Sequence, residues 1–568
     1  MSKRGVLTGF AALAALMALT PGAGTVSAHE AGASAKKRPM VRAVVMGLPG
    51  KGNALAAAQQ ISRPASGRYR HFLSLSQFRS QFGAGPKVRS KVLSLGKKNG
   101  VRWVRLDPTQ TVATALVSPA AAKRLFCAGP TIPGRPCRPK GYKWAIKQVS
   151  VGETFRQGPA PKPPHSGTSL TGTPEGCGGA IKSGALTPNQ LSTAYDVDEL
   201  HSRGLDGSGV RVNTLSSFVV GTSDFKTWAN CFNLPAPRVN QFAMPGGVAD
   251  TQDDPDETVL DVEALAALAP GLKQITPIFV PLDQGFSNSF ILFMLGALDP
   301  GRQDGTLPDV LSISDGVCEY RFNKSEIYLS NRLLAEAAVL GVTALSASGD
   351  LGFQGCETSK PGTSFPASSP YITAVGGTNL SLNAGNGIVS QPVWSTYATE
   401  PQQGVGSGGG PSHFWSRPGY QTGPGITPSI QSGNPMRLVP DLGAMASFKP
   451  GVAVFQTSTG GWGGGGGTSA ATPITAAMVA LAVQQEKQAG RPPLGLITPL
   501  LYRLGRGPGY GTTFYDVTVG TSSRKPNSAA GKTPAGGAAQ PGYDLATGLG
   551  SLKATAFADA VAANPPAP

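Results

Sequence analysis

The stretch Gly463-Gly464-Gly465-Gly466-Gly467-Thr468-Ser469-Ala470-Ala471-Thr472-Pro473 joins a run of five glycines to an apolar segment. Glycine has no Cβ, so this run allows the backbone to approach another segment or a ligand closely. Proline is tolerated in the first turn of a helix, and the apolar run 474–483 therefore predicts a helix that starts at Pro473. We expect Ser469 where a glycine loop meets a helix N-terminus, a place that favours developing negative charge.

This stretch is also compatible with structures that contain no reactive serine. A flexible glycine linker followed by a serine helix cap contains the same residues, and the stretch alone does not separate the two. A phosphate-binding loop of the nucleotide-hydrolase kind is excluded, because no lysine follows the glycines. The choice between a linker with a helix cap and a reactive serine therefore depends on the rest of the chain.

The chain has 568 residues, which is long enough for two or more domains. Strand-like and helix-like patterns alternate from residue 186 onward: 309–314, 343–347 and 372–375 are predicted buried strands, and 328–340 is a predicted crossover helix. This alternation predicts an α/β domain with a mostly parallel sheet flanked by helices. Ligands of such sheets bind beyond the carboxyl ends of the strands.

The amino-terminal part has a different organisation. Residues 40–126 predict a small α+β domain, with strand-like runs at 42–48 and 101–106. The stretch 130–186 is rich in Pro, Gly, Ser and Lys and shows little periodicity. We expect it to contain a linker that proteases can reach.

The first residues have the pattern of an export signal. Lys3 and Arg4 precede an apolar run at 6–19, and Val26-Ser27-Ala28 offers a small-residue cleavage site. We therefore expect a signal peptide at 1–28 and a secreted, extracellular protein. No other run of ~20 apolar residues occurs, so no membrane association is expected after the signal is removed.

Charge divides the chain into a basic and an acidic part. Residues 1–165 contain 27 Lys and Arg against three acidic residues, and the remainder contains 22 against 29. A basic segment usually suggests nucleic-acid binding, but these basic residues are scattered among amphipathic segments of an exported protein, so we expect no nucleic-acid partner. Complementarity between the two parts explains the division better.

Candidate catalytic carboxylates occur in two places. Glu257 and Asp261 are four residues apart in a predicted helix, so both side chains lie on one face. A helix cap would explain Glu257 but not Asp261. Alternatively, the two carboxylates share a proton, and such a pair could activate a serine only at acid pH. Asp350 follows the predicted strand 343–347, where it is either a turn residue or a protonated donor to an oxyanion.

A histidine is the usual base for a reactive serine. Of the five histidines, only His201 and His413 lie in the acidic part, and neither has the glycine-flanked setting of a subtilisin-type histidine. Lone histidines are more often packing or surface residues. A Ser-His-Asp hydrolase is therefore the weaker alternative.

Together these residues resemble the sedolisin family of serine-carboxyl peptidases, which includes the kumamolisins and the tripeptidyl peptidases. The resemblance extends from about residue 186 to 552 and rests on these motifs: Glu257-x-x-Leu260-Asp261, Ser312-Ile313-Ser314-x-Gly316-x-x-Glu319, Ser348-Gly349-Asp350, Ser364-Phe365-Pro366, Arg437-x-x-Pro440-Asp441 and Gly467-Thr468-Ser469-x-x-x-Pro473. In the basic part, Tyr69-Arg70-His71-Phe72-Leu73 resembles the activation propeptide of that family.

The resemblance implies a role for each candidate catalytic residue. Ser469 would attack the scissile carbonyl with Glu257 as its general base, Asp261 would orient Glu257, and protonated Asp350 would complete the oxyanion hole. Asp315 departs from the family, which usually has an aromatic or apolar residue at this position.

The same resemblance implies a subtilisin-like fold and a zymogen. We expect an activation propeptide at 40–150, a linker with the maturation site at 151–186 and a peptidase domain at 187–568. The expected partners are peptide or protein substrates and the chain's own propeptide, and the expected oligomeric state is a monomer. An inactive, secreted binding module on the same scaffold is the remaining alternative, and the intact catalytic residues oppose it.

One structural calcium ion near the carboxyl end is also implied by the family. The matching ligands would be the side chains of Asp516 and Asp544 and the carbonyl groups of Val517, Gln540 and Gly542. Oxygen-only ligation of this kind suits calcium rather than a transition metal. Gln540 stands where the family usually has glycine.

The six cysteines are an even set, as expected of an exported protein. We expect three pairs: Cys318 with Cys356, which follow the ends of neighbouring predicted strands, Cys127 with Cys137, which enclose a short loop, and Cys177 with Cys231 by elimination.

The charge division predicts how the zymogen opens. The basic part should dock on the acidic remainder at neutral pH, and acidification should weaken this attraction by protonating carboxylates. Separation and cleavage between about Ser150 and Leu186 would follow.

Overall fold

The computed structural model describes residues 41–128, 137–152, 172–216, 220–244, 256–280, 286–356, 362–397, 399, 404–426, 435–523 and 537–567. The predicted signal peptide and most of the predicted linker lie outside these residues. In the part that is described, no helix is long and apolar enough to cross a membrane.

The amino-terminal region contains a four-stranded antiparallel sheet in the order β2-β3-β1-β4. Its strands are β1 (Arg42–Gly47), β2 (Val101–Leu106), β3 (Val112–Val117) and β4 (Gln148–Val151), and its helices are α1 (Ala54–Ser62), α2 (Leu75–Phe82), α3 (Pro86–Leu93) and α4 (Pro119–Phe126). β4 lies inside the stretch that looked like a linker, because its residues pair with β1. The sheet therefore extends to Val151.

Strand β1 contributes to two hydrophobic cores because successive side chains point to opposite faces. Val44 and Met46 pack within the amino-terminal region. Ala43 and Val45 pack in a second core that includes helices of the carboxyl-terminal region. The amino-terminal sheet is thus joined to the carboxyl-terminal region by apolar packing.

The carboxyl-terminal region is built on a seven-stranded sheet in the order β18-β13-β10-β8-β5-β7-β6, and all its strand pairs are parallel. The strands are β5 (Arg211–Ser216), β6 (Phe242–Ala243), β7 (Gln274–Phe279), β8 (Val310–Ile313), β10 (Thr343–Ala347), β13 (Thr373–Thr378) and β18 (Leu442–Met445). The three predicted strands are confirmed as β8, β10 and β13, and the predicted α/β class is confirmed.

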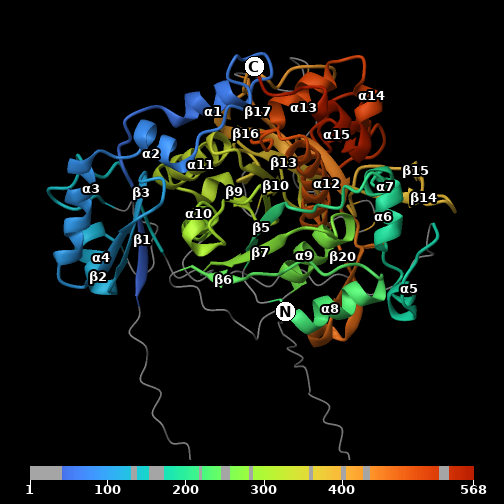
Figure 1. Cartoon of the computed structure of the whole chain (residues 1–568), viewed down its shortest axis with the longest axis horizontal. Helices are drawn as coiled ribbons and strands as arrows, with labels where there is room; N and C mark the ends of the chain where they lie inside the picture. The colour runs from blue at the N-terminus through green and yellow to red at the C-terminus, as the bar shows by residue number, and fades with distance from the viewer. Residues whose placement is uncertain are drawn as a thin grey trace, which may run out of the picture. The chain divides into compact units, whose positions relative to one another are not determined.

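Helices cover both faces of this sheet (Figure 1). Helices α9 (Asp256–Leu268) and α12 (Thr468–Gln488) share one core, and α10 (Phe286–Ala297) and α11 (Lys324–Val339) share the other. α11 begins where Asn323 and Glu326 form a capping box, which is four residues before the predicted start of this helix. α12 is buried over most of its length, including its first turn.

Shorter elements complete the fold. They are α5 (Gly178–Ser183), α6 (Pro188–Ala194), α7 (Asp198–Ser202), α8 (Thr222–Cys231), α13 (Thr498–Gly505), α14 (Tyr510–Thr513), α15 (Ala554–Ala562), β9 (Val317–Cys318), β11 (Leu351–Phe353), β12 (Ser364–Phe365), β14 (Ser381–Leu382), β15 (Ile388–Ser390), β16 (Gly406–Ser416), β17 (Met436–Val439), β19 (Val452–Gln456), β20 (Gly461–Gly465), β21 (Phe514–Tyr515) and β22 (Ser551–Leu552).

The predicted start of α12 at Pro473 is wrong. The helix begins at Thr468, and Gly467 at its N-cap has a φ of 80°, which favours glycine. Pro473 therefore lies inside the helix and removes the N–H that the carbonyl of Ser469 would otherwise accept. Part of the glycine run is also ordered as strand β20, which pairs with β19.

The three predicted cysteine pairs are confirmed. The structure contains disulfides between Cys127 and Cys137, between Cys177 and Cys231, and between Cys318 and Cys356.

Candidate active site

Ser469 lies in the first turn of α12, beyond the carboxyl ends of the central strands. Its side chain is partly exposed, whereas Thr468 and Ala470 on either side are buried. The Ser469 hydroxyl donates to the carbonyl oxygen of Ser314, which follows strand β8, at 3.4 Å. The helix start and the end of a strand thus hold this serine between them, in the place that the glycine motif predicted.

Glu257 and Asp261 lie one turn apart on α9, as their spacing predicted. Asp261 is fully buried, and Oε1 of Glu257 and Oδ2 of Asp261 are both buried without a hydrogen-bond partner. Burial raises the pKa of Glu257 well above its usual range, and Asp261 and Asp315 raise it further. The nearby Ser469 hydroxyl acts in the opposite direction and lowers the pKa of Glu257. Glu257 is therefore placed next to the serine as a carboxyl that retains its proton unusually well.

Ser314 connects Asp261 to the backbone of Ser469. The Ser314 hydroxyl lies 2.5 Å from Asp261 Oδ1 and 3.3 Å from the carbonyl oxygen of Ser469. Burial raises the pKa of Asp261 well above its usual range, and the hydrogen bond from Ser314 opposes this. When Asp261 carries a proton, it can donate to Ser314, whose own hydrogen is then free for the Ser469 carbonyl.

Asp350 follows β10 and caps the N-terminus of α12. Its Oδ1 accepts the Thr468 N–H at 2.8 Å and the Thr468 hydroxyl at 2.7 Å. A Cβ on Gly467 would lie only 2.6 Å from Asp350 Oδ2, so this approach requires glycine. Burial raises the pKa of Asp350, against the effect of both Thr468 bonds. Oδ1 is occupied, which leaves Oδ2 for a further partner.

Asp315, which departs from the family pattern, adds a further carboxyl to the site. It is partly exposed, follows Ser314 directly, and its charge raises the pKa of both Glu257 and Asp261. Burial raises the pKa of Asp315 itself to about 6. No sequence motif predicts the effect of Asp315 on the pKa values of Glu257 and Asp261, because this effect depends on how the end of β8 packs against α9.

The two histidines of the acidic part are engaged elsewhere. His201 Nε2 lies 2.9 Å from the Leu268 carbonyl oxygen at the far end of α9. The His413 backbone N–H donates to Glu319 at 2.9 Å, and its ring packs against Tyr320 with 4.8 Å between centroids. These contacts involve neither Ser469 nor the carboxylates near it, so they do not support a Ser-His-Asp arrangement.

Two of the expected calcium ligands, Asp516 and Gly542, are in contact between β21 and the segment before β22. Asp516 Oδ2 accepts the Gly542 N–H at 3.1 Å, and Asp516 Oδ1 accepts the Tyr510 hydroxyl at 2.9 Å. Asp544 is buried, and its hydrogen-bond donors are the neutral groups of Ala546 and Thr547. Two carboxylates with neutral neighbours, one of them buried, form an oxygen-rich set that fits a calcium ion. Among the described residues, no group of three or more acidic, histidine or cysteine side chains could hold a metal.

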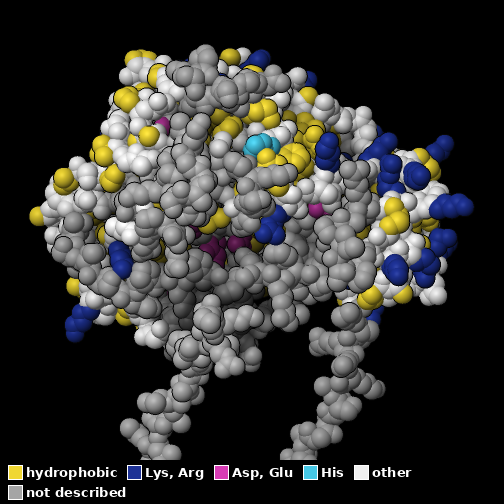
Figure 2. Space-filling view, turned by 180° about the vertical axis from the view of Figure 1, so that it is seen from behind, with side chains coloured by type: hydrophobic (Ala, Val, Ile, Leu, Met, Phe, Trp, Pro, Cys, Tyr) yellow, Lys and Arg dark blue, Asp and Glu magenta, His cyan; other side chains and the backbone are white. Residues whose placement is uncertain are grey.

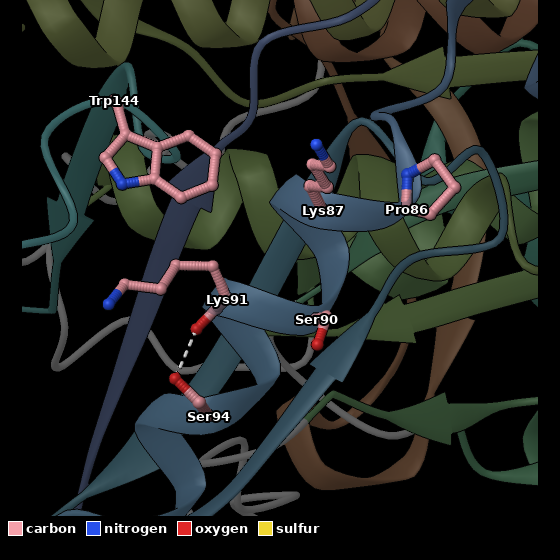
Figure 3. A pocket seen from close by; sticks show the side chains of 6 residues that line it. All are labelled: Pro86, Lys87, Ser90, Lys91, Ser94 and Trp144. Atoms are coloured by element: carbon pink, nitrogen blue, oxygen red, sulfur yellow. Dashed lines mark hydrogen bonds between the residues drawn. The ribbon is translucent and has the colours of Figure 1, made fainter.

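The amino-terminal region carries the positive charge that the sequence predicted. Figure 2 shows Lys and Arg side chains gathered over this region, where Lys87, Lys97 and Lys98 are exposed. A hollow of about 580 Å³ on α3 is lined by Pro86, Lys87, Ser90, Lys91, Ser94 and Trp144 (Figure 3). It contains none of the candidate catalytic residues and lies outside the site described above.

Comparison with known proteins finds relatives for both regions of the chain. The model of the family described as "Pro-kumamolisin, activation domain" matches residues 29–129. Kumamolisin from Bacillus sp. (strain MN-32) is 34% identical over 381 residues, covering 65% of this chain and 62% of kumamolisin. Sedolisin from Pseudomonas sp. (strain 101) is 25% identical over 423 residues, covering 70% of this chain and 68% of sedolisin. Human tripeptidyl-peptidase 1 is 32% identical over 264 residues, covering 44% of this chain and 42% of that protein.

The fold has a counterpart among solved structures. Pseudomonas sedolisin, a serine-carboxyl proteinase complexed with two molecules of pseudo-iodotyrostatin, superposes with a TM-score of 0.56 at 23% identity. The match covers 69% of this chain and the whole of that one. The chain is therefore similar to members of the sedolisin family in sequence and in fold. It matches less than two thirds of the length of kumamolisin.

Proposed function

We propose that this protein is a secreted serine-carboxyl peptidase that is made as a zymogen and acts in acid. The observation that carries the proposal is that Glu257, Asp261 and Asp350 lie around Ser469 at the start of α12 and that the pKa values of all three carboxyls are raised. Kumamolisin and sedolisin, to which the chain is related, support the same class of reaction.

In this mechanism Ser469 attacks the carbonyl carbon of the scissile peptide bond. Glu257 accepts the Ser469 proton and later gives it to the leaving amine, as a general base and then a general acid. Asp261 holds the second proton of the carboxyl pair, with Ser314 between it and the Ser469 carbonyl. General acid–base catalysis of this kind contributes roughly 10²–10⁴-fold.

Asp350 has the chemistry of an oxyanion donor when it is protonated. Thr468 occupies its Oδ1, so the proton on Oδ2 is available to the oxygen of the tetrahedral intermediate. The N-terminus of α12 adds a favourable dipole at the same place. One such donor is worth on the order of 3 kcal/mol in the transition state.

The raised pKa values determine the sign of the pH dependence. A carboxyl with a raised pKa stays protonated to higher pH than an exposed carboxyl does, and it loses the proton as pH rises through the raised value. Donation by Asp350 requires its proton. Activity should therefore be present in acid and be lost as pH rises.

The same proposal includes the remaining parts of the protein. The amino-terminal region would be the activation propeptide and residues 1–28 the export signal, and the mature enzyme would be a monomer acting on peptides or proteins. One calcium ion would be held by the carboxylates of Asp516 and Asp544 and the carbonyls of Val517, Gln540 and Gly542. When bound, it would tie two chain segments together and neutralise their charge.

Digestion of peptides by the protein across pH tests the proposal. Wild type should cleave best in acid, Ser469→Ala should abolish turnover and leave the propeptide attached, and Glu257→Gln should lose at least about 10²-fold. A pH optimum near neutrality with an active Glu257→Gln variant would favour a histidine base instead. No cleavage at any pH by a folded wild-type protein would favour an inactive binding module.

A further inference from the structure

The turn between β2 and β3 of the amino-terminal region is seated on helix α11. The hydroxyls of Thr109 and Thr111 lie 3.1 Å and 2.9 Å from Oε2 of Glu336, and all three side chains are buried. Glu336 is on α11 in the carboxyl-terminal region, so this contact joins the proposed propeptide to the proposed peptidase. It is separate from the residues around Ser469.

A second carboxyl lies on the other side of the two threonines. Asp107 accepts the backbone N–H groups of Thr109, Thr111 and Val112 at 2.7, 3.0 and 2.7 Å, and its Oδ2 is in close contact with the Thr109 hydroxyl. The turn itself therefore holds Asp107 in place. Asp107 and Glu336 are bridged by hydroxyl groups across the interface.

There are more close oxygen contacts here than hydrogens to fill them. Four contacts link Asp107, Thr109, Thr111 and Glu336, the fourth being the 2.7 Å contact between the two threonine hydroxyls. With both carboxyls ionised, the two hydroxyl hydrogens can form only two of these four hydrogen bonds. One further proton on either carboxyl supplies a third bond, which is why the geometry favours a shared proton.

The charge count leads to the same conclusion. Arg332 is the cation at this contact: its Nε lies 3.2 Å from Glu336 Oε1, and its other nitrogens donate to the carbonyls of Leu48 and Thr111 at 3.0 and 2.7 Å. The elements that pack most extensively on α11, namely α1, α10, β4 and β10, contain no ionisable side chain. On the side of the turn, Arg79 of α2 donates to the carbonyl of Pro108, and Arg89 of α3 donates to the side-chain oxygen of Gln110 at 2.7 Å. Arg79 and Arg89 donate to neutral acceptors, whereas Arg332 is the cation that lowers the pKa of both Asp107 and Glu336. Within this buried set, two carboxyls, one guanidinium and one added proton are neutral together, which low-dielectric surroundings favour.

We propose that the α11 surface around Glu336 and Arg332 binds the propeptide with uptake of one proton, shared by Asp107 and Glu336, so that mild acid strengthens this docking. The partner is the β2–β3 turn of this chain, before or after the linker is cut. The proposal rests on the proposed zymogen function for its biological meaning, but not for its geometry.

The raised pKa values of the two carboxyls also indicate that docking is stronger in acid. Burial raises the pKa of Glu336 to about 7, against the effects of Arg332 and the two threonines, and burial raises the pKa of Asp107. A group whose pKa is raised on docking contributes stability that is present at low pH and lost as pH rises through the raised value. A cavity of about 150 Å³ bounded by Thr111, Arg332 and Glu336 among others is large enough for water that could carry the proton.

Hydrogen exchange in the full-length Ser469→Ala protein tests the proposal without requiring activity. Peptides covering 104–117 and 330–340 report on the two sides of the contact, and their protection is corrected for the chemical exchange rate. We expect the corrected protection to rise about 10- to 100-fold from pH 8 to pH 5. In Glu336→Gln the rise should disappear, because the amide cannot take up the proton.

Glu326→Gln is the matched control. Glu326 is a buried carboxyl on the same helix that accepts a hydroxyl, Ser150, from the same region at 3.1 Å. This variant should keep the pH-dependent rise. Asp107→Asn is a second test variant if Glu336→Gln does not fold, and it should also remove the rise.

Flat protection in the parent protein, protection that falls in acid, or an equal rise in Glu336→Gln would each overturn the proposal. Self-cleavage of the Ser469→Ala protein would instead contradict the proposed nucleophile and leave this proposal standing. The two failures are therefore distinguishable.

Discussion

Ser314 and Ser469 are linked in both directions: the Ser469 hydroxyl donates to the Ser314 carbonyl at 3.4 Å, and the Ser314 hydroxyl lies 3.3 Å from the Ser469 carbonyl oxygen. The second contact is possible because Pro473, four residues on, offers no N–H to the Ser469 carbonyl. Ser314 is also 2.5 Å from Asp261. The proline inside α12 thus connects the backbone of the proposed nucleophile to a carboxyl of the proposed catalytic pair.

Ser314→Ala should therefore reduce turnover without abolishing it. The variant loses the hydroxyl that bridges Asp261 and Ser469, and that hydroxyl lowers the pKa of Asp261, so removing it should raise this pKa further. We expect the pH profile of kcat/KM to change shape as well as height, and Ser314→Thr to restore much of it. A uniform loss at every pH, with no recovery in Ser314→Thr, would mean that Ser314 has only a packing role.

Asp350→Asn should lower kcat by roughly 10²–10³-fold at the acid optimum. The amide keeps the cap on Thr468, because its oxygen can still accept the backbone N–H, so stability should change little. The measurement is kcat together with thermal unfolding of the same protein. A near-normal kcat in a correctly folded variant would show that Asp350 caps α12 and does nothing more.

Asp315→Asn should shift the loss of activity to lower pH. The charge of Asp315 raises the pKa of Glu257 and of Asp261, so removing it lowers both values. The proton that Asp261 holds in the carboxyl pair is then lost at lower pH, and the alkaline limb of kcat/KM should move with it. Asp559→Asn is the control, since Asp559 is exposed and pairs with Arg203 on the surface. An unmoved alkaline limb would contradict the coupling.

Several features of this protein could be read from its sequence because they are local. The glycine motif placed Ser469 at the start of a helix, the four-residue spacing placed Glu257 and Asp261 on one helical face, and strand patterns gave β8, β10 and β13. The resemblance to the family supplied the roles, which spacing alone left open between a catalytic site and helix caps.

The features that were missed depend on contacts between distant segments. The start of α12 was misplaced because Ser314, 155 residues away in the chain, compensates for the N–H that Pro473 lacks. Glu336 lies in a predicted helix and belongs to no motif. Its role depends on hydrogen bonds from Thr109 and Thr111, which precede it by more than 220 residues. Such pairs have no sequence signal until the sheet and its covering helices are placed.

Calcium should stabilise the mature protein. With free calcium at about 100 times its dissociation constant, the expected gain is about 2.7 kcal/mol in the free energy of unfolding. Excess chelator should therefore lower the melting temperature, and Asp516→Asn should remove the response to calcium. Asp559→Asn serves again as the control with an acidic residue lost elsewhere. Identical melting curves with and without chelator in the wild type would argue against the site.

Salt separates two kinds of electrostatic contact that hold the propeptide, one long-range and one buried. The long-range attraction between the basic region and the acidic remainder is screened by salt and fades as carboxylates protonate. The buried contacts, the proposed proton-sharing pair at Glu336 and the 2.8 Å ion pair between Arg70 and Glu486, are screened much less.

We therefore predict that raising the salt concentration accelerates self-cleavage of the full-length chain at pH 6–7, and that this acceleration fades towards pH 4. Cleavage should fall between about Ser150 and Leu186, as amino-terminal sequencing of the product would establish. Dividing the high-salt rate by the low-salt rate at each pH, and correcting for the salt effect on a peptide substrate, removes the pH dependence of catalysis itself. A ratio of one at every pH would show that long-range charge does not hold the zymogen closed.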